Sequence, residues 1–273
     1  HELSKYFNEP LEFRVFQNND WHQVKLHVKL CLAICDAPAR AKLLNHLSYS
    51  GHYGCNWCQV YGERDPNFGC MVFPMVEDFS NLKKTDSEWR TLAAEAAKVK
   101  KIDSKNWHLF KGILGPSPLL KLSYVDMVSI CPAEAMHSMF FGSVGLLFAY
   151  WTGKRSKTAS LDCEVYNKRL KRLKFPSNVL RVMPDMNQTL KSIDHENLLF
   201  YGFILLDGLV PSDEFDNYQM LSLIISTLCS REITQNQINQ CDEWIRLFMV
   251  EYSRIYPTEL HKYKVHTILQ LLE

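Results

Sequence analysis

The segment from Val24 to Ile34 alternates between apolar and other side chains, and this pattern constrains the fold more than any other. Basic residues fill several odd positions, while the even positions are all apolar: Val24, Leu26, Val28, Leu30, Leu32 and Ile34. A period of two predicts a strand with one buried face. Asp36 follows at once, so we expect its carboxylate to be fixed beyond the strand end and open to a metal ion. Because Pro38 comes two residues later, a helix-capping role for Asp36 is equally open.

A pair of cysteines with a two-residue spacing follows this segment. Cys55 and Cys58 could both bind one tetrahedral zinc ion from a tight turn. We call this turn, residues 51–58, the knuckle. A pair of reduced thiols or a redox motif has the same spacing. Zinc needs two further ligands, and the candidates in the sequence are His52, Cys70 and His137. Cys70 also suits a core position, because a single Cys among apolar neighbours is usually buried.

Four stretches of the chain follow one another in a recognisable order. They are Cys35-Asp36-Ala37-Pro38-Ala39-Arg40-Ala41, Tyr49-Ser50-Gly51-His52-Tyr53-Gly54-Cys55-Asn56-Trp57-Cys58, Glu134-Ala135-Met136-His137 with Gly142, and residues 191–201. Together they resemble the core of CACTA-type (En/Spm-like) transposases and their animal relatives. That family has an Asp-x-Pro-Ala-Arg-Ala segment, a Gly-Tyr-x-Gly-Cys-x-x-Cys element, an Asp-x-Met-His block and a Lys-Ala-Ser-Glu-Trp-Arg block. The resemblance spans nearly the whole chain.

The resemblance implies an α/β fold with the RNase H-like core of DDE-type transposases. In that fold the second catalytic acid stands at the end of the fourth strand, and the matching residue here is Asp36. The first acid would then lie upstream of His1, so we expect a core that is incomplete at its N-terminus. The expected segments are part of the core with the knuckle, a mainly helical insertion, and the acid-bearing core helix with a helical C-terminal region: residues 1–78, 79–184 and 185–273.

The resemblance also implies a reaction, which is the cleavage and transfer of DNA strands by phosphoryl transfer. Two Mg²⁺ ions held by three acids would activate the attacking oxygen. The family's third acid opens an apolar helix, and by position it corresponds to Asp194, with Glu196 as the alternate. Glu134 stands where the family has an aspartate in its Asp-x-Met-His block.

Glu134 and His137 also form a candidate pair by their spacing alone. On a helix, residues three apart lie on one face, where a carboxylate and an imidazole could serve a metal ion or a proton transfer. The other interpretation is a first-turn Glu that stabilises the helix dipole, followed by a His with a structural partner. The residues leave both interpretations open.

The most basic part of the chain lies between Gly153 and Lys174. We expect a helix here, because Leu170 and Leu173 form an apolar edge among the charges. Its four central cations are Lys168, Arg169, Lys171 and Arg172. Such a helix can lie along DNA phosphates, although a solvated surface has the same pattern. With a net charge of +1 the chain has no general positive field, so DNA binding has to come from a local patch.

Two further helices are predicted from their N-terminal sequences. Thr85 and Thr234 each stand three residues before a Glu or a Gln, which is the spacing of a capping box. After Thr234, apolar residues from Ile238 to Ile255 recur at helical spacing, and this stripe predicts a face that packs in the core.

Composition indicates a globular protein inside the cell. The chain is 47% hydrophobic and 22% charged, which is enough to build a core. Nine cysteines without a secretory signal indicate reduced thiols, and no apolar run approaches the roughly eighteen residues of a membrane span. The resemblance narrows the location to the nucleus and the partner to DNA, and it leaves a homo-oligomer open.

Two functions fit these expectations. The chain is either a fragment of a DDE-type transposase, inactive by itself because the first acid is missing, or a domesticated DNA- or protein-binding module without catalysis. In the second case the fold and a structural Zn²⁺ in the knuckle would persist, while the acids that hold the catalytic Mg²⁺ would have changed.

Overall fold

The computed structural model describes residues 7–76, 79–99, 106–155, 159–177, 179, 181 and 183–272. Within these residues the protein is mixed α/β and about 49% helical, and its sheets have only two strands each. It divides into two compact units, which are His1–Val60 with Asp78–Pro132 and Tyr61–Glu77 with Ala133–Glu273. The predicted mixed class is confirmed at this coarse level, and the three predicted segments remain a prediction.

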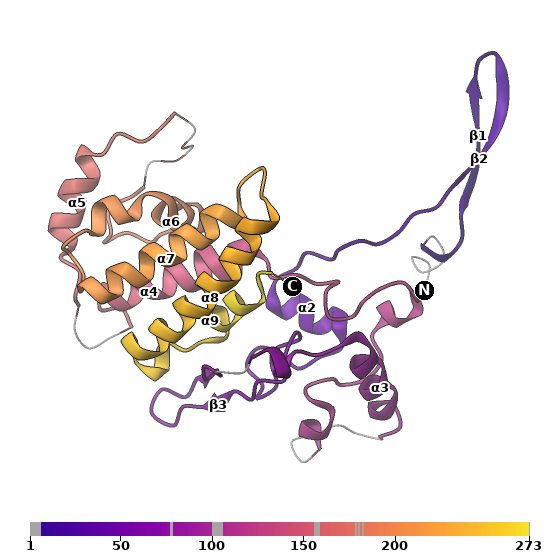
Figure 1. Cartoon of the computed structure of the whole chain (residues 1–273), viewed down its shortest axis with the longest axis horizontal. Coiled ribbons are helices and arrows are strands. Elements are labelled where there is room, and N and C mark those ends of the chain that lie inside the picture. Colours follow the sequence, from indigo (N-terminus) through magenta and orange to yellow (C-terminus); the bar gives the residue numbers. More distant parts are fainter. Residues whose placement is uncertain are drawn as a thin grey trace. The chain divides into compact units, whose positions relative to one another are not determined.

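The first unit begins with a β-hairpin, drawn in indigo in Figure 1. β1 (Leu11–Gln17) and β2 (Asp20–Leu26) pair antiparallel along their whole lengths. The turn between them consists of Asn18 and Asn19, whose φ angles of 53° and 62° are both positive. Two positive φ angles define the hairpin turn whose twist matches that of the strands, and Asn tolerates this conformation well.

The strand predicted from Val24 to Ile34 is wrong beyond Leu26. β1 begins at Leu11, directly after Pro10, so it offers no strand residue opposite the positions that follow Leu26. Pro10 itself has no N–H for a ladder. The apolar side chains continue, but Leu32 and Ile34 are 55% and 72% exposed. In the described structure the alternation therefore does not mark a buried face.

The rest of the first unit is mainly helical where the structure describes it. Its helices are α2 (Ala37–Leu44), η1 (Ser80–Leu82), α3 (Asp86–Ala96), η2 (Trp107–Phe110) and η3 (Pro118–Lys121). They surround a core in which Leu44, Trp89 and Met127 are fully buried. This core fixes α2 and α3, and the knuckle lies in the chain between them.

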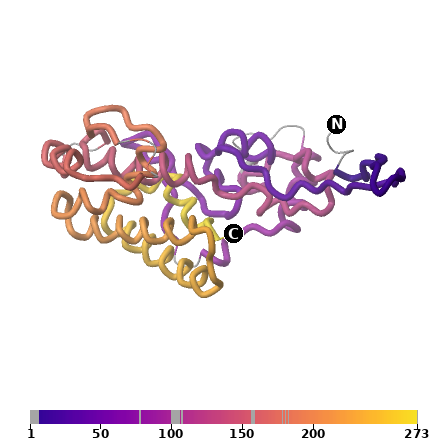
Figure 2. The backbone as a smooth tube through the Cα atoms, turned by 90° about the horizontal axis from the view of Figure 1, so that it is seen from above, coloured from indigo at the N-terminus to yellow at the C-terminus, as the bar shows by residue number. Residues whose placement is uncertain are grey.

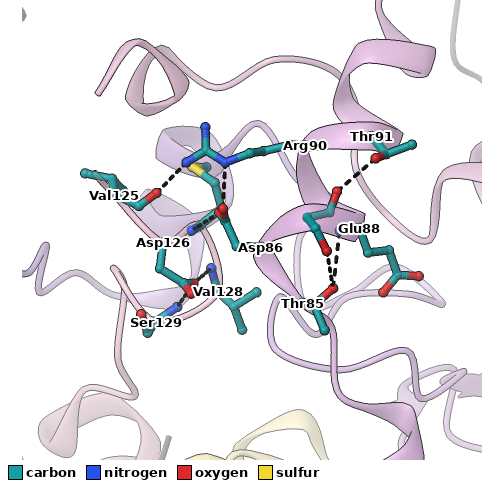
Figure 3. Close-up of polar contacts among 11 residues, drawn as sticks. Thr85, Asp86, Glu88, Arg90, Thr91, Val125, Asp126, Val128 and Ser129 are labelled. Atoms are coloured by element: carbon teal, nitrogen blue, oxygen red, sulfur yellow. Dashed lines mark hydrogen bonds and ion pairs between the residues drawn. The ribbon is translucent and has the colours of Figure 1, made fainter. Parts of the chain in front are cut away.

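α3 begins where its N-terminal sequence predicted. Thr85 Oγ1 accepts a hydrogen bond from the Glu88 N–H at 3.2 Å, which satisfies one of the free donors of the first turn. Asp86 pairs with Arg90 one turn later (2.6 Å), and Arg90 also donates to the Val125 carbonyl (Figure 3). These contacts attach α3 to the loop that begins at Val125.

The second unit is mainly helical and has one small sheet. The sheet pairs β3 (Glu63–Arg64) with β4 (Met71–Val72). The helices are η4 (Ala135–Val144), α4 (Gly145–Trp151), α5 (Cys163–Arg172), α6 (Ser192–Leu206), α7 (Ser212–Leu228), α8 (Gln235–Ile255), η5 (Thr258–Leu260), α9 (Tyr263–His266) and η6 (Thr267–Gln270). η4 is a π-helix, a form that is rare and usually short.

The core of the second unit is built from aromatic and aliphatic side chains of these helices. Phe148, Trp151 and Tyr218 are buried and meet edge to face, with ring centroids 5.1 to 6.0 Å apart. α7 and α8 run side by side (Figure 2). The predicted stripe on α8 is confirmed, because its central members are buried: Cys241, Ile245, Phe248, Met249 and Tyr252. The capping box of Thr234 with Gln237 is also confirmed.

We predict that Gly202→Ala destabilises the second unit. Alanine in a helix interior is ordinarily favoured over glycine by about 1 kcal/mol. Here the new Cβ would lie 2.7 Å from the Tyr218 hydroxyl, which donates to the Leu198 carbonyl. Overpacking costs roughly 1–3 kcal/mol, so the steric term exceeds the propensity gain. Thermal unfolding should show a lower Tm for Gly202→Ala, and adding Tyr218→Phe should recover part of it. A Tm equal to or above that of the wild type would contradict the close packing of Gly202 against Tyr218.

Candidate functional site

The knuckle brings two buried thiols together in the first unit. Cys55 and Cys58 are both 0% exposed, and their sulfur atoms lie within 4.8 Å of each other. Two sulfurs that each bind one zinc ion at about 2.3 Å are necessarily less than about 4.6 Å apart, so the pair can close on zinc with little adjustment. Gly54 makes the turn possible, because a Cβ there would lie 2.7 Å from the Ser48 carbonyl oxygen.

A neighbouring segment fixes the backbone of the knuckle. The Lys84 N–H donates to the Trp57 carbonyl, and the Gln59 N–H donates to the Leu82 carbonyl, both at 2.8 Å. The buried guanidinium of Arg40 lies over the Trp57 ring, 4.3 Å from its centroid. The two thiols are therefore held by backbone pairing and by packing.

The electrostatics of the pair favour a metal over redox chemistry. Burial raises the pKa of the Cys58 thiol well above its ordinary value, and the neighbouring Cys55 adds to this. Reactive cysteines need the opposite, a lowered pKa that exposes a thiolate at neutral pH. A metal ion replaces the thiol protons outright, so a raised pKa makes binding dependent on pH without preventing it.

The further zinc ligands predicted from the sequence lie in different surroundings. His52 is half-buried within the knuckle. Cys70 is half-buried in the second unit, just before β4. His137, also in the second unit, is bound through Nδ1 to Glu134 at 2.8 Å. The structure thus brings Cys55 and Cys58 together, and it gives His137 a carboxylate partner in its own unit.

His266 is a metal-binding candidate to which the sequence analysis gave no role. Its side chain is 2% exposed, and a neutral imidazole is a ligand that suits zinc. Within the second unit, His266 stacks on Phe73 with ring centroids 5.1 Å apart. It lines a small cavity together with His261, five residues earlier in the chain. The H-x₄-H spacing of these two histidines is the signal that could have identified them.

Two of the predicted acids cap helices. Asp36 is the N-cap of α2, and its Oδ1 accepts from the Ala39 N–H at 2.8 Å. Glu134 is the N-cap of η4 and uses both oxygens: Oε1 accepts from the Met136 N–H at 2.7 Å, and Oε2 accepts from the His137 N–H at 2.9 Å. The capping interpretation of Asp36 therefore has direct structural support, and Glu134 lies at a helix N-terminus, one position before the first turn that its dipole interpretation assumed.

Asp194 is bound on both oxygens in the interior of the second unit. The residue is 0% exposed; its Oδ1 accepts from Arg181 Nε at 2.7 Å, and its Oδ2 accepts from the Lys191 N–H at 2.7 Å. The alternate acid, Glu196, is half-buried on α6. A Mg²⁺ ion needs carboxylate oxygens that are free to bind it. Both oxygens of Glu134 and of Asp194 already accept N–H donors, and their place in a magnesium site remains a prediction.

The predicted basic helix exists as α5, but its cations divide into two groups. Arg169 donates to the Leu205 and Asp207 carbonyls at 3.0 and 2.6 Å, so it caps the C-terminal end of α6. Lys168, Lys171 and Arg172 are exposed. Lys171 has only a loose contact with Asp185, at 3.6 Å. Three cations of the predicted patch are therefore available on the surface.

Comparison with protein-family models and with curated proteins gave no match for this chain. Over the described residues, every helix is too short or too polar to cross a bilayer. The function is therefore inferred from the residues and contacts of the chain itself.

We predict that Arg181→Met strongly destabilises the second unit. The change leaves the buried Asp194 without its cation; because the Arg181 side chain is 38% exposed, the cost should lie below the roughly 3 kcal/mol of a fully buried pair and above that of an exposed pair. The double variant Arg181→Met/Asp194→Asn should recover part of the loss, because an amide oxygen can still accept from Lys191. Chemical denaturation of the three proteins measures this.

The matched control is Arg246→Met, which removes an exposed ion pair with Asp242 (3.0 Å). Exposed ion pairs contribute about 0–1 kcal/mol to the free energy of unfolding, so this variant should have nearly the same free energy of unfolding as the wild type. Equal effects of Arg181→Met and Arg246→Met would show that Asp194 does not depend on its pair.

Proposed function

We propose that this chain is part of a CACTA-type, transposase-derived protein that binds DNA in the nucleus and does not itself cut it. The observation that carries the proposal is the buried pair Cys55 and Cys58, which fits the cysteine element of the resemblance and the chemistry of zinc. The RNase H-like core belongs to the same proposal; its support is the resemblance together with the mixed α/β class.

Zinc in the knuckle would have a structural role. A bound ion would cross-link the turn and stabilise the folded unit, because a structural zinc contributes its binding free energy to folding. Cys55 and Cys58 would supply two thiolates.

DNA binding would use the exposed cations of α5. Lys168, Lys171 and Arg172 stand at i, i+3 and i+4, so they share one face of the helix. Lysine and arginine on one face can neutralise successive phosphates of a duplex without reading its sequence. Arg169 is excluded from this set, because its guanidinium caps α6.

The second candidate is a catalytic transposase core, and Asp36 is the residue that favours it. Among the described contacts, its Oδ1 accepts one hydrogen bond, from the Ala39 N–H, so the carboxylate keeps capacity for another ligand. A strand-nicking assay with Mg²⁺ or Mn²⁺ separates the two candidates. Nicking that disappears in Asp36→Asn, a change that keeps a good helix cap, would favour the enzyme. Absence of nicking under all metal conditions agrees with the first candidate.

We predict one zinc ion per chain, lost when the proposed ligands are changed. Elemental analysis of protein purified without added metal should give one zinc for the wild type and none for Cys55→Ser/Cys58→Ser. Cys70→Ser and His137→Ala serve as controls and should keep the zinc ion. If the double cysteine variant holds as much zinc as the wild type, the knuckle is not the site.

We predict that Lys168→Gln/Lys171→Gln/Arg172→Gln weakens the binding of any duplex DNA. Each phosphate contact contributes about 0.9 to the slope of log affinity against log salt, so the slope should fall by up to about three. The matched control neutralises three cations that already have acidic partners: Lys25→Gln/Arg246→Gln/Arg254→Gln. Fluorescence anisotropy at several salt concentrations measures both. An unchanged slope in the first variant would mean that α5 is only a solvated surface.

A further inference from the structure

Lys84 is a fully buried lysine beside the knuckle. Its side chain ends against neutral groups: Nζ donates to the Cys55 carbonyl at 2.8 Å and to Nε2 of His46 at 2.9 Å. The residue is 4% exposed. A buried ammonium is costly unless it is paired with negative charge, so its surroundings need an explanation.

His46 cannot supply that negative charge. Its Nδ1 lies 2.8 Å from the Leu47 carbonyl and therefore carries the ring proton, which leaves Nε2 as the acceptor for Lys84. The ring stacks on Trp89 with centroids 5.2 Å apart. Burial also lowers the pKa of His46 well below its ordinary value, so the ring is neutral. His46 orients Lys84 without balancing its charge.

The nearest carboxylate on α3 already has its own cation. Glu88 Oε1 pairs with Lys111 at 2.7 Å, and Gln59 donates to both Glu88 oxygens at 2.8 Å. Among its described contacts, Lys84 therefore depends on its two hydrogen bonds, one of which holds the carbonyl of Cys55, the first cysteine of the knuckle.

We propose that Lys84 is a positioning residue of the zinc site. It is not a ligand; its Nζ fixes the Cys55 carbonyl, and with it the backbone from which the Cys55 sulfur would reach the ion. The inference rests on the proposed zinc site. Partners of this kind, one shell outside the ligands, typically change metal affinity by about 10- to 100-fold when they are removed.

The test is the zinc affinity of Lys84→Met, measured against a competing chelator in the full chain. We expect one zinc per chain, as in the wild type, with a dissociation constant about 10- to 100-fold higher. Cobalt substitution should still give the absorption bands of a tetrahedral thiolate site, because all ligands remain. Lys84→Gln, which keeps a donor for Cys55 without the charge, should fall between the two.

The control is Lys83→Met, which removes a cation from the adjacent position. It should bind zinc as the wild type does. The rise in Tm on adding zinc provides a second readout: it should shrink in Lys84→Met and stay unchanged in Lys83→Met. A purely structural role would lower the Tm of the zinc-free and zinc-bound forms equally.

The possible results distinguish a failure of the proposed zinc site from a failure of the role of Lys84. A wild-type chain that binds no zinc overturns the zinc site and this inference with it. A wild-type chain that binds zinc, together with a Lys84→Met affinity within twofold of it, overturns the role of Lys84 alone. If Lys84→Met does not fold, as judged by circular dichroism, Lys84→Gln decides by the same affinity criterion.

Discussion

The start of a helix leaves backbone N–H groups without helical partners, and much of this structure depends on how they are satisfied. Asp36 does so for α2, Glu134 for η4 and Asp194 for the segment that enters α6. These are the acids that the family resemblance links to catalysis. A carboxylate at such a position stabilises the fold whether or not it ever binds a metal, so the acids alone are weak evidence for an enzyme.

Each unit contains a buried ionisable side chain, and the two side chains have different kinds of partner. In the second unit Asp194 has a cation, Arg181, and a backbone donor, so both of its oxygens are occupied. In the first unit the described acceptors of Lys84 are both neutral, so hydrogen bonds alone hold that buried nitrogen. A carboxylate with a cation and an ammonium held by neutral acceptors are thus both tolerated inside this protein, because each polar group finds hydrogen-bond partners.

Local sequence patterns predicted helix caps and turns. Contacts between residues far apart in the chain could not be predicted from the sequence. The Thr234 cap and the knuckle depend on neighbours within a few positions, and both were predictable. The strand prediction was wrong beyond Leu26, because alternation of apolar residues indicates a buried face but does not supply a neighbouring strand to pair with. Arg169 was predicted to face DNA, yet it caps a helix end 36 residues away in the chain. No short-range pattern could separate it from the cations beside it.

The geometry of α5 limits what the chain can recognise. Successive residues on a helix are rotated by about 100°, so turning Arg169 inward leaves the cations at i−1, i+2 and i+3 on a common outer face. Three cations support a small electrostatic footprint on a chain whose net charge is only +1. If α5 binds DNA as proposed, such a footprint would hold the backbone weakly, and its affinity would fall as salt is added. It carries no information about base sequence, so any specificity for a DNA site requires contacts beyond those of α5.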